Sequence, residues 1–216
     1  MATRMFTWIW IFEIVLHGVA VMPQVLEPPG TRWGKNATSC EEFERDAHFE
    51  PTEVIDAMWK IFYSWADTTE LSLIVFSLLS AKRLKRIKAV VDSIDPGLGI
   101  PWLDAEFLME PRDGVQILLL RQGTPGAYRA LIIAEQRYKA RPNPRPILNM
   151  ADVRMKLVGR IMGMMSCEEL TAYALARQHE MPVTEADCVV RANTLGYRGP
   201  GGHSYLQIQR MIKQDL

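Results

Sequence analysis

The stretch "IDAMWKIFYSW", residues 55–65, places two tryptophans, a phenylalanine and a tyrosine close together. Side chains of a β-strand point alternately to opposite faces of a sheet, so the stretch can be sorted with a period of two. One face of the predicted strand carries Trp59, Ile61, Tyr63 and Trp65. The other face carries Met58, Lys60, Phe62 and Ser64. The stretch therefore predicts a strand whose aromatic face packs against a core.

Further strand candidates follow at short intervals, separated by turns rich in glycine and proline. They cover residues 70–79, 84–94, 102–111, 115–122, 128–138, 146–152, 153–166 and 169–177, with a short tail strand at 204–209. The first of these is continuously apolar, so a buried helical turn is an alternative there. The basic cluster 82–88 lacks interleaved aromatic residues and is interpreted as a solvated strand face or loop. The pattern predicts one all-β domain, a sandwich or an up-and-down barrel.

One helix is predicted near the end of the chain, in "PVTEADCVVRANTLGY". Thr184 suits the N-cap position, and Asp187 three residues later completes a near capping box. Gly196 suits the C-terminal end of the helix. Val183, Val190 and Leu195 are expected to cover an apolar surface.

The chain has 216 residues, and its 25 basic and 25 acidic residues give a formal net charge of zero. This balance gives no electrostatic footprint for nucleic acid or for an anionic membrane. Residues 1–20 predict an export signal, because Arg4 precedes an apolar run with small residues near a cleavage site at Ala20. Glu13 and His17 interrupt that run and argue more strongly against a transmembrane span. We therefore expect a secreted protein without transmembrane anchoring.

Two local features agree with secretion. Asn36 begins an Asn-Ala-Thr glycosylation sequon within the irregular leader, residues 21–39. The three cysteines are Cys40, Cys167 and Cys188. In an oxidising compartment two of them would pair and one would be left over.

The sequence contains no convincing catalytic pattern. The four histidines are scattered, and there is no Cys-x-x-Cys or His-x-x-x-His spacing for a metal. A nucleophile elbow, a P-loop and a dinucleotide-binding glycine run are also missing from the sequence. We therefore predict a protein that is not an enzyme and has no metal or cofactor.

Three segments in order resemble motifs of the lipocalin family, especially its insect and apolipoprotein D-like branch. The first-strand motif Gly-x-Trp is matched by "AMW", which retains Trp59. The Thr-Asp-Tyr motif is matched at "MADV", which retains Asp152, and the arginine that ends the eighth strand is matched by Arg177. The resemblance covers roughly residues 40–210. The departures from the family pattern are Ala57, Ala151, Val153 and Tyr173.

The resemblance implies an eight-stranded antiparallel up-and-down barrel over residues 40–210, with one C-terminal helix packed outside and a tail at 211–216. It implies that Trp59 closes one end of the barrel and that Arg177 lies across its ring, a cation–π contact worth roughly 0.5–2 kcal/mol. It also implies a disulfide between Cys40 and Cys167. Cys188, on the helix, would then be a buried free thiol, with an intermolecular disulfide as the alternative.

The resemblance also implies a function: secreted binding and transport of a small hydrophobic or amphipathic ligand, such as a pigment, retinoid, fatty acid or odorant-like compound, inside the barrel. The candidate ligand-binding residues are Trp59, Ile61, Tyr63, Met155, Leu157 and Ile161. Residues 155, 157 and 161 are expected to share one strand face, with Lys156, Val158 and Arg160 on the other. An anionic ligand is favoured if this second face points inward, a question that the sequence leaves open.

Two alternatives to a carrier stay open. The first is a secreted interaction protein whose barrel is filled by its own side chains and whose loops bind a protein partner. The second is an isomerase of the same fold, which would need a reactive cysteine at the cavity, whereas the helix that carries Cys188 is expected outside the barrel. The sequence does not decide between a monomer and a homo-oligomer.

Overall fold

The computed structural model of the chain describes residues 37–55, 57–66, 73–112, 114–135, 146–199 and 201–214. The expected signal peptide, most of the leader and the sequon residue Asn36 lie outside these residues. Within them, the sequon residue Thr38 is buried, and its hydroxyl accepts a hydrogen bond from the Arg198 backbone N–H at 2.8 Å. Secretion and glycosylation remain predictions.

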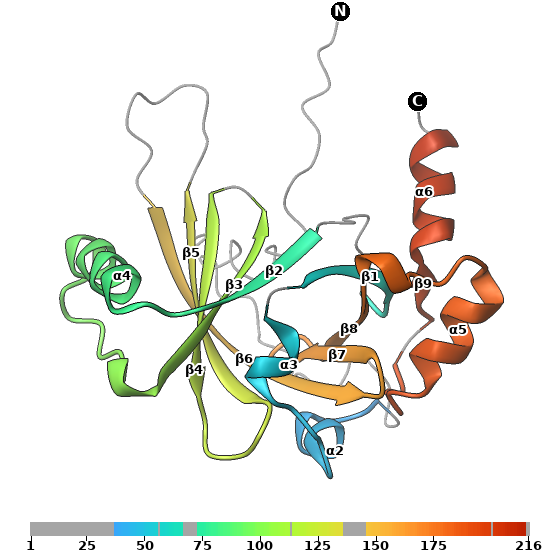
Figure 1. Cartoon of the computed structure of the whole chain (residues 1–216), viewed down its shortest axis with the longest axis horizontal. Coiled ribbons are helices and arrows are strands. Elements are labelled where there is room, and N and C mark those ends of the chain that lie inside the picture. Colours follow the sequence, from blue (N-terminus) through green and yellow to red (C-terminus); the bar gives the residue numbers. More distant parts are fainter. Residues whose placement is uncertain are drawn as a thin grey trace, which may run out of the picture.

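Eight antiparallel strands form a closed barrel, because the first strand pairs with both the second and the eighth. Each remaining strand pairs with its neighbours in the sequence, which is the up-and-down arrangement, visible in Figure 1. The expected fold class is confirmed. A short ninth strand pairs with the first strand from outside. The strands are β1 Met58–Ser64, β2 Leu73–Leu78, β3 Ala105–Arg112, β4 Val115–Arg121, β5 Ala127–Glu135, β6 Pro146–Val158, β7 Ile161–Ser166, β8 Thr171–Arg177 and β9 His203–Ser204.

The predicted alternation of β1 holds only for its first half. Trp59 and Ile61 point into the barrel, where they join the interior hydrophobic cluster. The pairing register between β1 and β8 then shifts between Ile61 and Tyr63, which is a β-bulge. The extra residue in β1 turns Tyr63 and Trp65 to the outer surface. The prediction of one continuous aromatic face is therefore wrong beyond Ile61.

The segment "LKRIKAVVDSI" does not form the predicted strand but belongs to helix α4, Ala81–Ile94. Ile87 and Val91, one helical turn apart, are its buried residues. The Ser80 hydroxyl caps the helix by accepting the backbone N–H of the residue three positions later at 3.2 Å. The basic residues of this segment thus lie on a helix, mostly on its solvent side.

The predicted tail strand at 204–209 is also wrong beyond Ser204. Residues from Tyr205 onward form helix α6, Tyr205–Gln214. The Gln207 side chain accepts the Ser204 backbone N–H at 2.8 Å, and the Ser204 hydroxyl accepts the Gln207 backbone N–H at 3.2 Å. This reciprocal pair is a capping box, which starts a helix.

Helix α5, Glu185–Asn193, follows the prediction, with Thr184 as its N-cap and Gly196 in the left-handed region at a φ of 66°. Its buried residues are Cys188 and Ala192, which face the barrel together with Leu195. Val183 and Val190 are exposed, so the predicted apolar face is correct only for Leu195. The other short helices are α2 Cys40–Glu44, α3 Pro51–Val54, η1 Trp102–Asp104 and η2 Gln178–Glu180.

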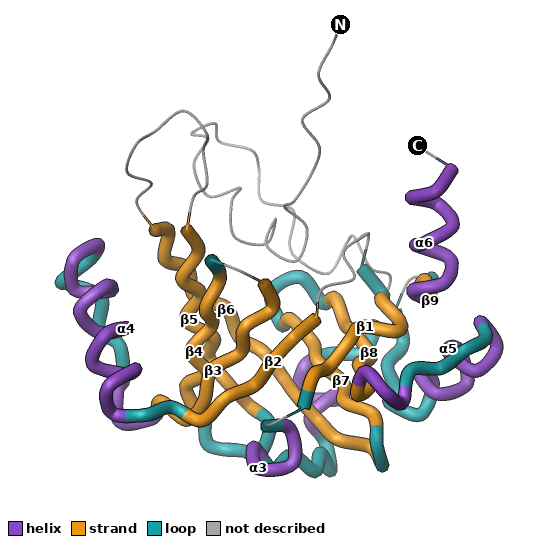
Figure 2. Tube along the Cα trace, turned by 45° about the horizontal axis from the view of Figure 1, so that its top comes forward, coloured by secondary structure: helices purple, strands orange, loops and turns teal. Residues whose placement is uncertain are grey.

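Helices α4 and α5 cover opposite sides of the barrel, as Figure 2 shows. Leucines on the outer faces of β3, β4 and β5 pack against α4. Alanines on the outer face of β8 pack against α5, together with Phe43 and Phe62. In β7, a Cβ added to Gly163 would lie 2.9 Å from side-chain atoms of both Leu195 and Phe43. Small outward residues thus let α5 approach the barrel closely.

The part of the chain that the structure describes contains no helix long and apolar enough to cross a membrane.

Candidate functional site

One end of the barrel is closed around Trp59, of which 1% is exposed. Its indole Nε1–H donates a hydrogen bond to the Val54 carbonyl of α3 at 2.9 Å. The Arg177 guanidinium lies over the indole ring at 5.5 Å from its centroid, as the resemblance implied. Arg177 Nη2–H also donates to the Glu53 carbonyl at 3.1 Å. The side chain thus fastens the end of β8 to both the ring and α3.

Residues that precede β1 complete this closure. The chain at His48 forms an isolated bridge with Leu157 at the end of β6, and Phe49 then enters the interior cluster. The Phe49 ring stacks on Phe107, with centroids 6.2 Å apart, and meets Tyr128 edge-on at 5.8 Å. The Tyr128 hydroxyl donates to a Glu106 carboxylate oxygen at 2.7 Å. Burial, followed by this contact, raises the pKa of Tyr128.

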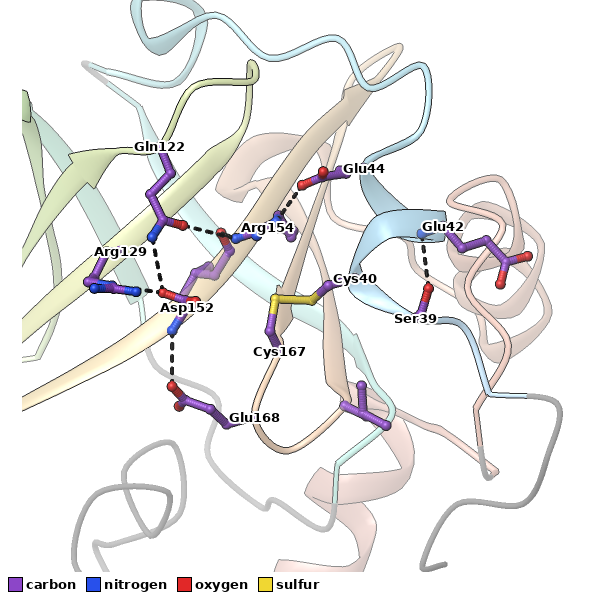
Figure 3. The surroundings of a disulfide bond; sticks show 12 residues. Ser39, Cys40, Glu42, Glu44, Gln122, Arg129, Asp152, Arg154, Cys167 and Glu168 are labelled. Atoms are coloured by element: carbon purple, nitrogen blue, oxygen red, sulfur yellow. Dashed lines mark hydrogen bonds and ion pairs between the residues drawn. A yellow bond between two sulfur atoms is a disulfide. The ribbon is translucent and has the colours of Figure 1, made fainter. Parts of the chain in front are cut away.

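The disulfide between Cys40 and Cys167 is present, with their Cα atoms 5.6 Å apart (Figure 3). It joins the start of α2 to the residue after β7, across a sequence separation of 127 residues. In the chain-entropy model a loop of this length allows about 4–5 kcal/mol of stabilisation. Cys188 is a buried free thiol in the outer cluster beneath α5, and burial raises its pKa.

Asp152 lies beside the disulfide, on the outer surface of the barrel (Figure 3). Its carboxylate forms an ion pair with Arg129 of β5 at 3.0 Å and accepts a hydrogen bond from Gln122 at 3.3 Å. Its backbone carbonyl accepts the Cys167 N–H at 2.9 Å, and its N–H donates to Glu168 at 3.3 Å. Asp152 therefore links β5, β6 and the disulfide, and it does not face the interior.

The candidate ligand-binding residues divide into two groups. Trp59, Ile61, Met155 and Leu157 belong to the interior cluster. Tyr63 is outside, where its hydroxyl donates to the Gly202 carbonyl at 3.2 Å. Ile161 lies in the outer cluster, because the turn after β6 places it on β7 instead of on one strand with Met155. Tyr63 and Ile161 are thus removed from the interior wall.

The basic face of β6 points outward, which answers the question that the sequence left open. Arg154 forms an ion pair with Glu44 of α2. Lys156 Nζ lies 4.2 Å from the centroid of the Phe43 ring and donates to the Phe43 carbonyl at 3.1 Å. Burial lowers the pKa of Lys156. These cations are therefore not available to a ligand inside the barrel.

Two hydroxyls face the interior at the end of the barrel opposite Trp59. Ser166, the last residue of β7, is the register partner of Val153 on β6 and of Thr171, the first residue of β8. Directly paired residues point to the same side of a sheet, and Val153 belongs to the interior cluster. Both hydroxyl oxygens are buried, and neither has a hydrogen-bond partner within the described part of the chain. Alternate residues of a strand share a face, so Thr171 lies on the same face as Tyr173, and Ser166 on the same face as Met164. This alternation can be read from the sequence.

The described residues contain no group of three or more His, Cys, Asp or Glu side chains that could hold a metal ion. Comparison of the chain with protein-family models, with curated proteins and with solved structures finds no match.

Proposed function

We propose that the protein is a secreted carrier that holds one small hydrophobic or amphipathic molecule inside its barrel. The observation that carries the proposal is that the two ends of the barrel have different side chains. One end is closed by Trp59, Arg177 and the segment that includes Phe49 and Val54. The inner wall of the opposite end carries Val153, Ser166 and Thr171, with Tyr173 two residues along β8 from Thr171. Such an arrangement suits a site with a floor and an entrance.

The inner wall supports the same proposal. It is lined by aliphatic and aromatic side chains and by four methionines, Met109, Met155, Met162 and Met164. Methionine is flexible and polarisable, so these side chains can change rotamer to admit a ligand. Burial of apolar ligand surface would supply roughly 25 cal/mol per Å² removed from water.

Two further features agree with a secreted carrier. The chain resembles lipocalins at Trp59, Asp152 and Arg177, and the carriers of that family bind small apolar molecules. A structural disulfide is typical of proteins in oxidising compartments, so the bond between Cys40 and Cys167 supports export.

A filled barrel that binds a protein partner through its loops is the second candidate. The packing of the interior favours it, because Trp59, Met155 and Met162 are each no more than 1% exposed. In this candidate the methionines are core filler and the function lies on the outer surface.

Titration with retinol separates the two candidates. We expect the carrier to bind about one retinol per chain, with quenching of tryptophan fluorescence because Trp59 forms the floor of the site. Trp59→Phe should retain binding but lose much of the quenching. A folded protein that binds no retinol, and no displaceable apolar probe, would instead support the filled barrel.

A further inference from the structure

We infer that Ser166 and Thr171 hold the polar end of the ligand, and that this end is an uncharged oxygen group such as a hydroxyl or a carbonyl. The inference rests on the proposed function and names the class of ligand. It is carried by the two buried hydroxyls, which have no hydrogen-bond partner among the described residues, and by the charges around them.

The hydroxyls are buried, with 8% of Ser166 and 6% of Thr171 exposed. Neither oxygen has a hydrogen-bond partner among the residues that the structure describes. A buried polar group without a partner loses its hydrogen bonds to water and gains none in return. Two such groups on adjacent strands, as direct register partners, form a donor and acceptor pair that a bound oxygen atom can satisfy.

The wall next to the pair carries both small and large apolar side chains. Val153 is the register partner of Ser166 on β6, and Ala151 lies two residues further along the same face. Larger interior side chains lie close by as well: Met164 and Tyr173, two positions from Ser166 and Thr171, and Tyr128, the register partner of Val153 on β5.

Charge around the pair favours a neutral group. The neighbouring cations of β6, Arg154 and Lys156, point outward and have partners there. Arg177 lies at the far end of β8 from Thr171, about 20 Å away at the rise of a strand. An ionised carboxylate buried beside two hydroxyls, without a described cation, would keep a large desolvation cost. An alcohol or a carbonyl would not.

Retinol and retinoic acid provide the test, because they share one polyene and differ in the polar end. The unsubstituted protein should bind retinol about tenfold more tightly than retinoate at pH 7.5. Ser166→Ala combined with Thr171→Val removes both hydroxyls at nearly constant volume. This double variant should bind retinol about tenfold more weakly and lose the preference. Ser93→Ala, which removes an exposed hydroxyl on α4, should leave both affinities unchanged.

The thermal midpoint of the unliganded double variant gives a second readout. It should equal or exceed that of the parent protein, because the variant removes two buried hydroxyls that have no partner among the described residues. A lower midpoint would show that the hydroxyls are bonded within the protein and would overturn the inference.

The experiment distinguishes failure of the carrier proposal from failure of the proposed role of Ser166 and Thr171. Tight retinol binding that does not change in the double variant, or a preference for retinoate, overturns the role of Ser166 and Thr171 and leaves the carrier intact. Binding of neither probe overturns both proposals.

Discussion

Trp59 and Arg177 close one end of the barrel, and each side chain holds the other in position. The indole is hydrogen-bonded to the Val54 carbonyl, and the guanidinium covers the ring and bonds to the Glu53 carbonyl. A charged side chain is tolerated at this edge of the core because its planar group lies on the face of an indole while its N–H groups find oxygen atoms. Two distant parts of the sequence are thereby joined.

Replacement of Arg177 by methionine should lower the free energy of unfolding by about 1–3 kcal/mol, since it removes the cation–π contact and one hydrogen bond. Urea unfolding followed by tryptophan fluorescence measures the change. Lys85→Met, at an exposed position of α4, should alter stability by less than about 0.5 kcal/mol. Equal effects of the two substitutions would show that the guanidinium contributes nothing specific.

At the scale of elements, close backbone contacts position the strands. Gly126, in the turn before β5, has a φ of 81°, and its carbonyl accepts the Met155 N–H at 2.7 Å. A Cβ at this position would lie 2.0 Å from the Met155 carbonyl oxygen. Gly159, in the turn between β6 and β7, has a φ of 60° and open space around it. The two glycines thus share a left-handed conformation but differ in their surroundings.

Alanine substitutions at these two glycines should therefore differ in cost. Gly159→Ala carries only the backbone strain, about 1 kcal/mol. Gly126→Ala adds a clash with backbone and should cost about 1–3 kcal/mol more. Thermal unfolding of both variants compares them directly. If Gly126→Ala is no more destabilising than Gly159→Ala, the contact between this turn and β6 is looser than the structure has it.

Sequence periodicity predicted most strands but failed where two periods coexist. In α4, Lys85, Ile87, Ala89 and Val91 match a strand, while Leu84, Ile87 and Val91 match a helix equally well. The capping box at Ser204 and Gln207 is visible in the sequence as Ser-x-x-Gln and marks the start of α6. The bulge in β1 could not be predicted from the sequence of β1 alone. It depends on how β1 pairs with β8, where two residues of β1 lie opposite one residue of β8. The bulge and the turn after β6 explain why Tyr63 and Ile161 were misplaced.

At the scale of the whole molecule, a barrel with a hydrophobic interior is covered by separate outer layers. Helix α4 covers one side and α5 the other, and each has its own hydrophobic cluster. The disulfide fastens α2, which precedes the barrel, to Cys167, the residue after β7. The resemblance implied the Trp59 contact, the disulfide and α5, whereas α4 and α6 were not expected as helices.

Loss of the disulfide should destabilise the whole barrel. Cys40→Ala combined with Cys167→Ala is expected to cost about 2–5 kcal/mol, because the crosslink restricts a long loop of the unfolded chain. The thermal midpoint should fall to that of the parent protein in dithiothreitol. Dithiothreitol should not shift the midpoint of the double variant further. A further shift would mean that reduction acts elsewhere.

Native mass spectrometry of the protein secreted by cultured cells tests the carrier proposal most directly. The account predicts a species heavier than the chain by one small molecule, which is released on unfolding and carries a hydroxyl or carbonyl group. Saturation with retinol should displace that molecule and leave a species heavier by one retinol. The mass of the chain alone, both before and after incubation with retinol, would contradict the account.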